Sequence, residues 1–341
     1  MPTPRWFHHE AGRAHAVPGH PERPERILAL EAELERRDWF GWERVEAPQA
    51  TREQLERVHP AAHVDLIAAL SAQGGGAIDL DTTATAGSYE AARRAAGGAV
   101  ALVDALLADG VPCGFSALRP PGHHAEAARA MGFCFFNSVA VAAAHARAAH
   151  GAERVAIIDW DVHHGNGTNA IFHADPSVLF ASIHESPLYP GTGPATDAGA
   201  GPGKGFTVNL PVPGGSGDAT HGSLVEHVLA PLIRDWAPQL VLVSAGFDAH
   251  RADPLATCTL SEAGFAGMTA SLRAACAEVG APLGLVLEGG YAVEALADSV
   301  AALMPVLGAA EVPAAPELPV HPLAVAARER LARFWPTLAA A

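Results

Sequence analysis

The chain has 341 residues, of which 49% are hydrophobic, so it is long enough to bury a large core in one α/β domain or two ordinary domains. Its formal net charge of −15 argues against a dedicated nucleic-acid binder, which normally presents a basic face. Four cysteines with no CxxC spacing exclude a disulfide framework and a cysteine-based zinc module.

The N-terminal segment lacks the apolar core that a secretory signal requires. The sequence also contains no run of about 18 apolar residues, the length that a membrane-spanning helix needs. We therefore expect a cytoplasmic protein that contacts neither membranes nor nucleic acids directly.

Apolar runs typical of strands alternate with alanine-rich helical patterns along most of the chain. The strand-like runs cover residues 113–118, 154–161, 177–184, 205–213, 239–247 and 283–291, and the helical patterns cover residues 137–151, 221–238 and 261–280. Continuous apolar strands that alternate with helices are typical of a parallel sheet covered on both faces. We expect one domain over residues 1–341, in which the Pro/Ala-rich segment 309–322 is a surface connection to a C-terminal helix.

Titratable residues gather directly after these strands. The segments concerned read "RPPGHH", "DWDVHHGNG", "SIHESPLYPGTG", "SAGFDAHRADP" and "EGGY", and all five carry ionisable groups. Ligands bind at the carboxyl ends of the strands in an open parallel sheet. The sequence therefore predicts a single site built from these segments.

Asp159, Asp161 and His163 alternate, so at the strand period their side chains project on one side. Asp161 and His163, joined by Asp248 from a later strand end, supply three ligands and leave an open position for water. One imidazole with two carboxylates suits Zn²⁺, and Fe²⁺ accepts the same donors. Isolated aspartates more often cap strand ends by hydrogen bonds, but the pattern D-x-D-x-H-H-G with a second aspartate-bearing strand end favours a metal.

The tandem histidines His123 and His124 follow Pro-Pro-Gly and predict acid–base chemistry, because imidazole titrates near neutral pH and can take a proton from water. Tyr291 follows Gly289 and Gly290 at a strand end. A phenol there can donate to a developing oxyanion, although a turn tyrosine is the simpler interpretation of "GGY" alone.

Seven motifs, "HPERPERI", "RPPGHHA", "MGFCFFN", "DWDVHHGNGT", "YPGTG", "SAGFDAHRADPL" and "LEGGY", run from His20 to Tyr291. In this order they resemble the histone deacetylase superfamily, in particular its class II-like bacterial amidohydrolase branch, which is related to acetylpolyamine amidohydrolases. The resemblance implies the three-layer arginase/deacetylase fold, with a mostly parallel sheet of about eight strands and helices on both faces. It also implies zinc-dependent hydrolysis of N-acetyl amides on lysine side chains or similar alkylamines.

The resemblance further implies one zinc ion per chain and structural potassium ions. It assigns zinc to Asp161, His163 and Asp248. It assigns a potassium ion to Asp159, Asp161, His163, Ser182 and Ile183, and a second one, mainly through backbone carbonyls, to Phe172, Asp175, Val178 and Phe206.

By the same resemblance, His124 acts as general base and then as general acid. Asp159 lies behind His123 and raises its basicity. Asn166 stands where class I members carry an aspartate, which should leave His124 less basic than an ion-paired histidine. Tyr291 polarises the acyl carbonyl.

The resemblance also implies a narrow aromatic tunnel for an extended alkylamine arm. Its residues are Gly132, Phe133, Tyr189, Leu255, Gly289 and Gly290. Leu255 stands where some polyamine-preferring relatives carry a glutamate, which weakens the alternative of an acetylpolyamine amidohydrolase. Asp79 and Asp81 either face the tunnel entrance or lie in solvent.

Three other functions fit less well. A two-manganese arginase site would need aspartates where Gly165 and His250 stand. A non-catalytic acyl-group binding protein would be expected to lose Tyr291, a tandem histidine or a zinc ligand, and all are retained. Ser216 lacks the G-x-S-x-G context of a serine hydrolase. The sequence leaves open whether the chain forms a homo-oligomer and which N-acyl amine is its substrate.

Overall fold

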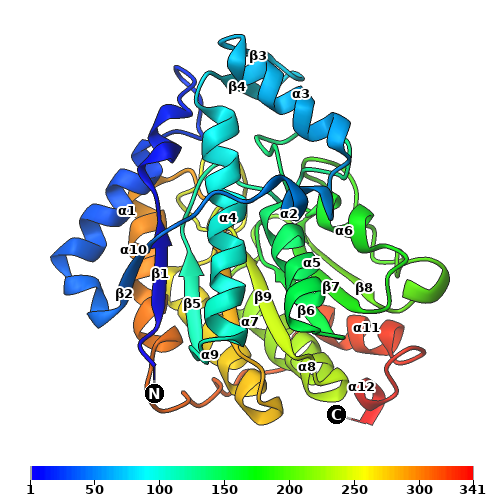
Figure 1. The fold of residues 1–341 in the computed structure, drawn as a ribbon. Coiled ribbons are helices and arrows are strands. Elements are labelled where there is room, and N and C mark those ends of the chain that lie inside the picture. Colours follow the sequence, from blue (N-terminus) through cyan, green and yellow to red (C-terminus); the bar gives the residue numbers. More distant parts are fainter. Residues whose placement is uncertain (1, 341) are drawn as a thin grey trace.

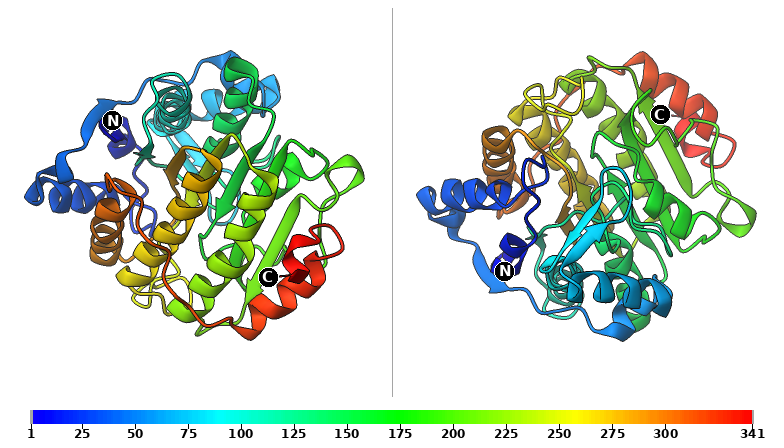
Figure 2. Two further views of the ribbon diagram at one scale, coloured as in Figure 1. Left: turned by 90° about the horizontal axis from the view of Figure 1, so that it is seen from below. Right: turned by 90° about the horizontal axis from the view of Figure 1, so that it is seen from above.

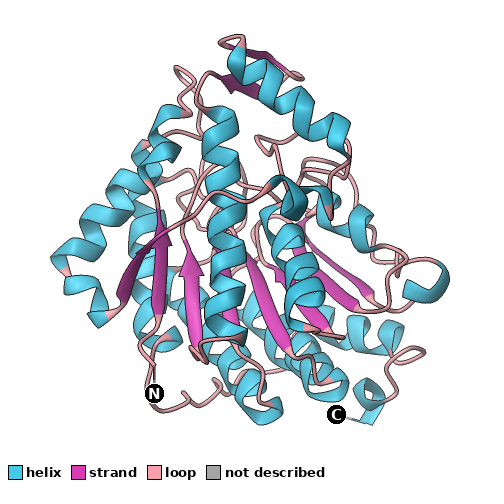
Figure 3. Ribbon diagram, in the orientation of Figure 1, coloured by secondary structure: helices cyan, strands magenta, loops and turns pink. Residues whose placement is uncertain are grey.

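A parallel sheet of eight strands lies at the centre of the computed structural model, which describes residues 2–340 (Figures 1 and 3). The spatial order of the strands is β2-β1-β5-β10-β9-β6-β7-β8, and every neighbouring pair is parallel. The strands are β1 (Arg5–His8), β2 (Glu43–Glu46), β5 (Cys113–Ser116), β6 (Val155–Asp159), β7 (Val178–Glu185), β8 (Thr207–Val212), β9 (Leu240–Ala245) and β10 (Leu283–Leu287). The predicted fold class is confirmed.

Helices cover both faces of this sheet, as the two end-on views show (Figure 2). They are α1 (Glu25–Arg36), α2 (Arg52–Glu56), α3 (Ala61–Ala72), α4 (Ser88–Leu107), α5 (Ser138–His150), α6 (Asn166–Phe172), α7 (Asp218–Leu224), α8 (Ala230–Trp236), α9 (Glu262–Val279), α10 (Val293–Leu307), α11 (Pro322–Leu331) and α12 (Thr337–Ala340). A small antiparallel pair, β3 (Gly75–Ala77) and β4 (Thr83–Thr85), lies beside α3 beyond the carboxyl ends of the main strands (Figure 1).

The central strands read as continuous apolar runs because each buries side chains on two faces. In β6, Val155 and Ile157 belong to the core under α4 and α5. Ala156 and Ile158 belong to the core on the opposite face, which α9 and α10 cover. This alternation is what the period of two residues in a strand requires.

The helix expected over residues 221–238 is interrupted. Helix α7 ends at Leu224, a π-helical turn spans Val225–Leu229, and α8 begins at Ala230. Pro231 has no backbone N–H to donate to the carbonyl of His227, four residues earlier, so a regular α-helix cannot continue through this point.

Strands β1 and β2 have no counterpart among the predicted elements. Each has only four residues, and β2 reads Glu-Arg-Val-Glu at the edge of the sheet, where three of its residues are exposed. Charged side chains are typical of edge strands, since they discourage pairing with other chains. Such a strand carries no apolar signal.

Between α10 and α11, residues 308–321 form no helix or strand, and Val312 and Val320 are exposed. Within residues 2–340, none of the helices combines the length and the apolar character needed to cross a membrane.

The buried histidine His59 should make stability depend on pH. Its Nδ1 donates to the carbonyl of Ala127 at 2.9 Å, and its Nε2 accepts from the Asn137 N–H at 2.9 Å, so only the neutral ring satisfies both partners. Burial lowers the pKa of His59 to about 4. The unfolded chain, with a histidine pKa of about 6.5, takes up this proton first as the pH falls.

We therefore expect the contribution of His59 to be complete above pH 6.5 and to be lost between pH 6.5 and 4, by up to roughly 3 kcal/mol. Urea unfolding at several pH values in this window measures the loss. A His59→Gln variant should lose less stability over the same window than the natural chain. Equal losses in the two proteins would contradict the assignment.

Candidate active site

Three side chains that can bind a metal converge at the carboxyl ends of β6 and β9. Asp161 and His163 follow β6, Asp248 follows β9, and the two strands are paired. His163 Nδ1 lies 3.1 Å from Asp161 Oδ1 and 3.2 Å from Asp248 Oδ2. All three residues are buried, and one potential ligand atom of each lies within 4.8 Å of the others. Two buried carboxylates beside a single imidazole are a donor set that a divalent cation would stabilise.

Backbone amides fix the orientation of both carboxylates. Gly289 N–H donates to Asp161 Oδ2 at 2.8 Å, and Val162 N–H donates to Asp248 Oδ1 at 2.9 Å. Each carboxylate thus keeps one oxygen directed toward His163. A Cβ atom at Gly289 would overlap both carboxylates, so a glycine is required at this close approach.

The tandem histidines are each held through Nδ1. His123 donates to Asp159 Oδ2 at 3.0 Å, and His124 donates to Asn166 Oδ1 at 2.8 Å. Their ring centroids lie 4.0 Å apart. A histidine that donates from Nδ1 and is neutral carries its lone pair on Nε2, which is the arrangement a general base needs.

The two histidines have opposite electrostatic environments. Burial alone would lower the pKa of His123, but the Asp161 and Asp159 carboxylates outweigh burial and raise this pKa well above its usual range. Burial lowers the pKa of His124 well below its usual range, and the neighbouring His123 and His163 lower it further. The neutral amide of Asn166 supplies no charge to offset this. These surroundings favour the neutral form of His124 and the protonated form of His123.

Tyr291 lies just after β10, opposite Phe133, with the two ring centroids 5.8 Å apart. Burial raises the pKa of the Tyr291 phenol well above its usual range, so the hydroxyl keeps its proton at neutral pH and can donate a hydrogen bond. The backbone N–H of Tyr291 donates to Asp253 Oδ2 at 2.6 Å, which anchors this turn.

A cavity of about 220 Å³ connects these groups to the surface. It is lined by Asp81, His124, Gly132, Phe133, His163, Leu188, Tyr189, Leu255 and Tyr291. Four of the predicted tunnel residues are in this lining. Gly289 and Gly290 are not, because they lie behind it: Gly289 binds Asp161, and the Gly290 carbonyl accepts from Arg26 Nε at 2.6 Å.

Comparison with known proteins identifies the family. The histone deacetylase domain family matches residues 20–307. The chain is 42% identical over 287 residues to the histone deacetylase-like amidohydrolase of Pseudomonas aeruginosa, covering 81% of this chain and 73% of that protein. It is 39% identical over 295 residues to a probable deacetylase of Archaeoglobus fulgidus, covering 84% and 81%.

The chain belongs to the histone deacetylase family. The crystal structure of the HDA15 HD domain superimposes on this histone deacetylase fold with a TM-score of 0.92 and 37% identity, covering 99% of this chain and 97% of that one. The predicted family and fold are confirmed. Membership also confirms the predicted enzyme class, a hydrolase that acts on amides.

At the rim of the histone deacetylase cavity, the two acidic residues that the sequence singled out behave differently. Asp81 lines the cavity, and burial raises its pKa. Asp79 is outside the lining, where its Oδ1 accepts from the N–H groups of Asp81 and Thr82 at 3.1 and 2.7 Å. Asp79 therefore shapes the loop, and Asp81 is the one of the two that lines the cavity.

The residues assigned to potassium form two groups. In the first group, Asp159 at the end of β6 is the register partner of Ser182 within β7, and Ser182 Oγ lies 3.0 Å from His184 Nδ1. The second group lies at the turn between α6 and β7 and just before β8, where the Phe206 carbonyl accepts from Phe180 N–H at 2.9 Å. Potassium binding at both places stays a prediction.

Glu288 is a buried site residue to which the sequence analysis gave no role. Its Oε2 accepts from Gly122 N–H at 2.6 Å and from His123 N–H at 3.0 Å, so it holds the backbone that carries the tandem histidines. Burial raises the pKa of Glu288 to about 7. Glu288 precedes Gly289 in "LEGGY". Its position, a glutamate directly after an apolar strand, is the feature of the sequence that could have indicated a role in the site.

A buried ion-pair cluster supports the turn from behind. Arg26 Nη2 donates to the Glu288 carbonyl at 2.5 Å, and the Arg26 guanidinium lies 5.0 Å from the centroid of the Tyr291 ring. Glu22 Oε1 accepts from Arg26 at 3.1 Å and from Arg119 at 2.7 Å. These charges stand in "HPERPERI" and "RPPGHHA", but sequence spacing does not reveal that Arg26 reaches a strand end more than 260 residues away.

Proposed function

We propose that this histone deacetylase family member is a zinc-dependent deacetylase that hydrolyses N-acetyl amides of lysine side chains or similar alkylamines. One observation carries the proposal. His163 converges with Asp161 and Asp248, and it lines a cavity that is also lined by His124 and Tyr291. Metal ligands, a base and an oxyanion donor thus face one small space.

The donor set fits zinc. Asp161, His163 and Asp248 would hold the ion, and three protein ligands leave a coordination position for water or substrate. When bound, zinc supplies Lewis-acid polarisation of the acyl oxygen and lowers the pKa of water. Fe²⁺ accepts the same ligands. We also propose potassium at the two groups described above.

His124 and Tyr291 then have separate roles in the reaction: His124 transfers protons, and Tyr291 donates a hydrogen bond. His124, whose low pKa keeps it neutral, takes the proton of the attacking water at Nε2 and later delivers it to the leaving amine nitrogen. Asn166 holds the His124 ring in the tautomer that this step needs. Tyr291 donates its hydroxyl hydrogen to the acyl oxygen as negative charge develops there.

The cavity walls favour an alkylamine arm. Phe133, Tyr189, Leu188 and Leu255 present apolar surface to an extended methylene chain. Asp81 is an acidic group on the same lining and would attract a second ammonium, which is the specific observation in favour of acetylpolyamine as the alternative substrate. Leu255 adds no charge to this attraction.

A side-by-side hydrolysis assay tests the proposal. The zinc-loaded protein is given an acetyl-lysine peptide, N-acetylputrescine or N8-acetylspermidine, each with and without a chelator. We expect turnover of the peptide, loss of turnover with chelator, and recovery with added zinc. Higher kcat/KM for the polyamines would establish the alternative, and no turnover of any substrate with zinc bound would contradict a deacetylase.

A further inference from the structure

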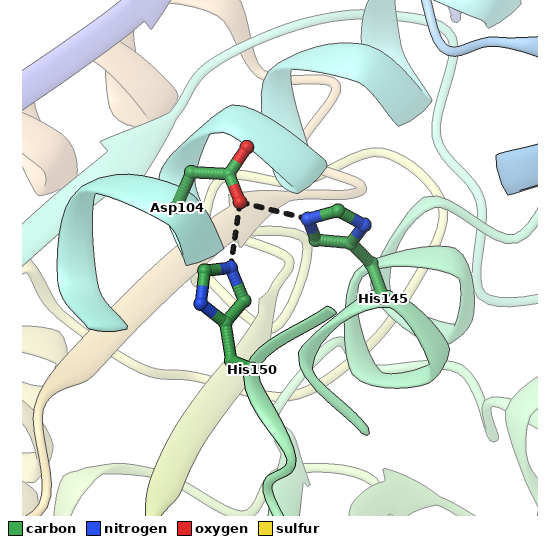
Figure 4. Close-up of side chains that lie close together, drawn as sticks. All are labelled: Asp104, His145 and His150. Carbon is green, nitrogen blue, oxygen red and sulfur yellow. Dashed lines mark hydrogen bonds and ion pairs between the residues drawn. The ribbon is translucent and has the colours of Figure 1, made fainter. Parts of the chain in front are cut away.

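A second group of metal-binding side chains lies outside the active site, between helices α4 and α5. It consists of Asp104, His145 and His150 (Figure 4). Nε2 of His145 and Nε2 of His150 each lie 2.7 Å from the same oxygen, Asp104 Oδ1. The potential ligand atoms of the three residues lie within 4.8 Å of one another, as in the catalytic group.

We propose that Asp104, His145 and His150 form a second site for a divalent transition-metal ion, with zinc as a fitting occupant. Two imidazole nitrogens and one carboxylate oxygen are donors that Zn²⁺, Ni²⁺ and Cu²⁺ accept. The proposal is independent of the deacetylase reaction, because none of the three residues lines the catalytic cavity.

The local field and exposure suit a bound cation. Asp104 lies in the last turn of α4, which has no basic residue, and His150 is the last residue of α5. The last turn of α5 also holds Arg147, whose charge is paired with Asp175 at 2.7 Å. The negative ends of both helix dipoles therefore point toward the group. The His145 side chain is 8% exposed, His150 18% and Asp104 50%, so an ion can enter from solvent and keep water as its remaining ligands.

The charge of Asp104 is already maintained without a metal. Partial burial raises its pKa, but hydrogen bonds from His145 and His150 outweigh burial and lower it. A metal ion would take the place of the two N–H donors, and each imidazole would then bind it through Nε2 and carry its hydrogen on Nδ1.

One neighbour opposes the exchange and provides a sharp test. Arg57 Nη1 lies 3.0 Å from His145 Nδ1 and donates to it, so a hydrogen on Nδ1 would face another donor. Arg57 must turn aside when metal binds, and its ion pair with Glu53 at 2.9 Å gives it an alternative partner. In Arg57→Gln, the amide oxygen can accept from Nδ1, and we expect zinc to bind roughly tenfold more tightly at this site.

The test counts zinc per chain at a set free-zinc concentration, after chelator treatment and dialysis. Because the natural chain should bind one ion in the active site and one here, His150→Gln should bind one ion fewer while its hydrolysis rate stays unchanged. In an Asp248→Ala background, which lacks a catalytic ligand, calorimetry should detect one zinc ion, and the added His150→Gln change should remove it.

Equal zinc counts in the natural chain and His150→Gln would overturn the proposal, as would equal calorimetric binding in the two Asp248→Ala backgrounds. Should Asp248→Ala fail to fold, the first comparison decides by itself. Absence of hydrolysis with the expected difference in zinc count would contradict the deacetylase proposal and leave this site standing.

Discussion

Replacement of Tyr291 by phenylalanine should lower kcat by about 10²–10³-fold, the usual cost of removing one oxyanion donor. The phenol is buried, and burial raises its pKa, so it keeps its proton and can donate in the cavity that is also lined by His124 and His163. The ring would still pack against Phe133, so folding and metal content should be unchanged. Because the donor acts on charge that develops during the reaction, KM should change little.

Steady-state kinetics with an acetyl-lysine peptide measure this effect. Tyr89→Phe is the matched control, since it removes the same hydroxyl from α4, outside the cavity lining. The control should retain full activity and zinc. A Tyr291→Phe enzyme that keeps its kcat would remove Tyr291 from the mechanism.

Replacement of Asp248 by alanine should abolish zinc binding at the active site and reduce activity by at least about 10³-fold, because a catalytic metal supplies several kcal/mol of charge stabilisation. The change leaves two ligands, Asp161 and His163, and it deprives the Val162 N–H of its acceptor, Asp248 Oδ1. Asp248→Asn keeps an acceptor oxygen for the Val162 N–H and nearly the same side-chain volume. This variant should therefore be more stable than Asp248→Ala, and it should bind zinc more weakly than the natural chain.

Metal analysis and peptide hydrolysis on the same preparations test this pair of variants. The control is Asp298→Ala, which removes an exposed carboxylate from α10. One zinc ion fewer than in the natural chain, together with loss of turnover, is the expected result for Asp248→Ala. Full zinc content in that variant would show that Asp248 is no ligand.

The local part of the site was predictable from the sequence because it depends on residues next to one another. Asp161 and His163 are two residues apart after an apolar run, and His123 and His124 are adjacent. The apolar runs themselves were readable because central strands bury both faces, as β6 does with Ile157 and Ile158.

The predicted strands and helices in the middle of the chain were confirmed to within a few residues, with the exception of the helix that Pro231 interrupts. The N-terminal strands were not predicted because a polar edge strand such as β2 has no apolar period to detect. The roles of Glu22, Glu288 and Arg26 were not predictable either, because the position of a charged residue within a motif does not indicate which distant residue it contacts.

The amino-acid sequence by itself determined the layered α/β class, the family and the residue types of the site, because hydrophobic period and short motifs act over a few neighbours. Only the tertiary structure decided which strands adjoin, and so brought Asp248 to His163, Arg26 to Gly290, and Asp104 to His145 and His150. These contacts depend on strand order and helix packing between residues that are tens to hundreds of positions apart in the sequence. A local sequence pattern does not indicate which distant segments pack together.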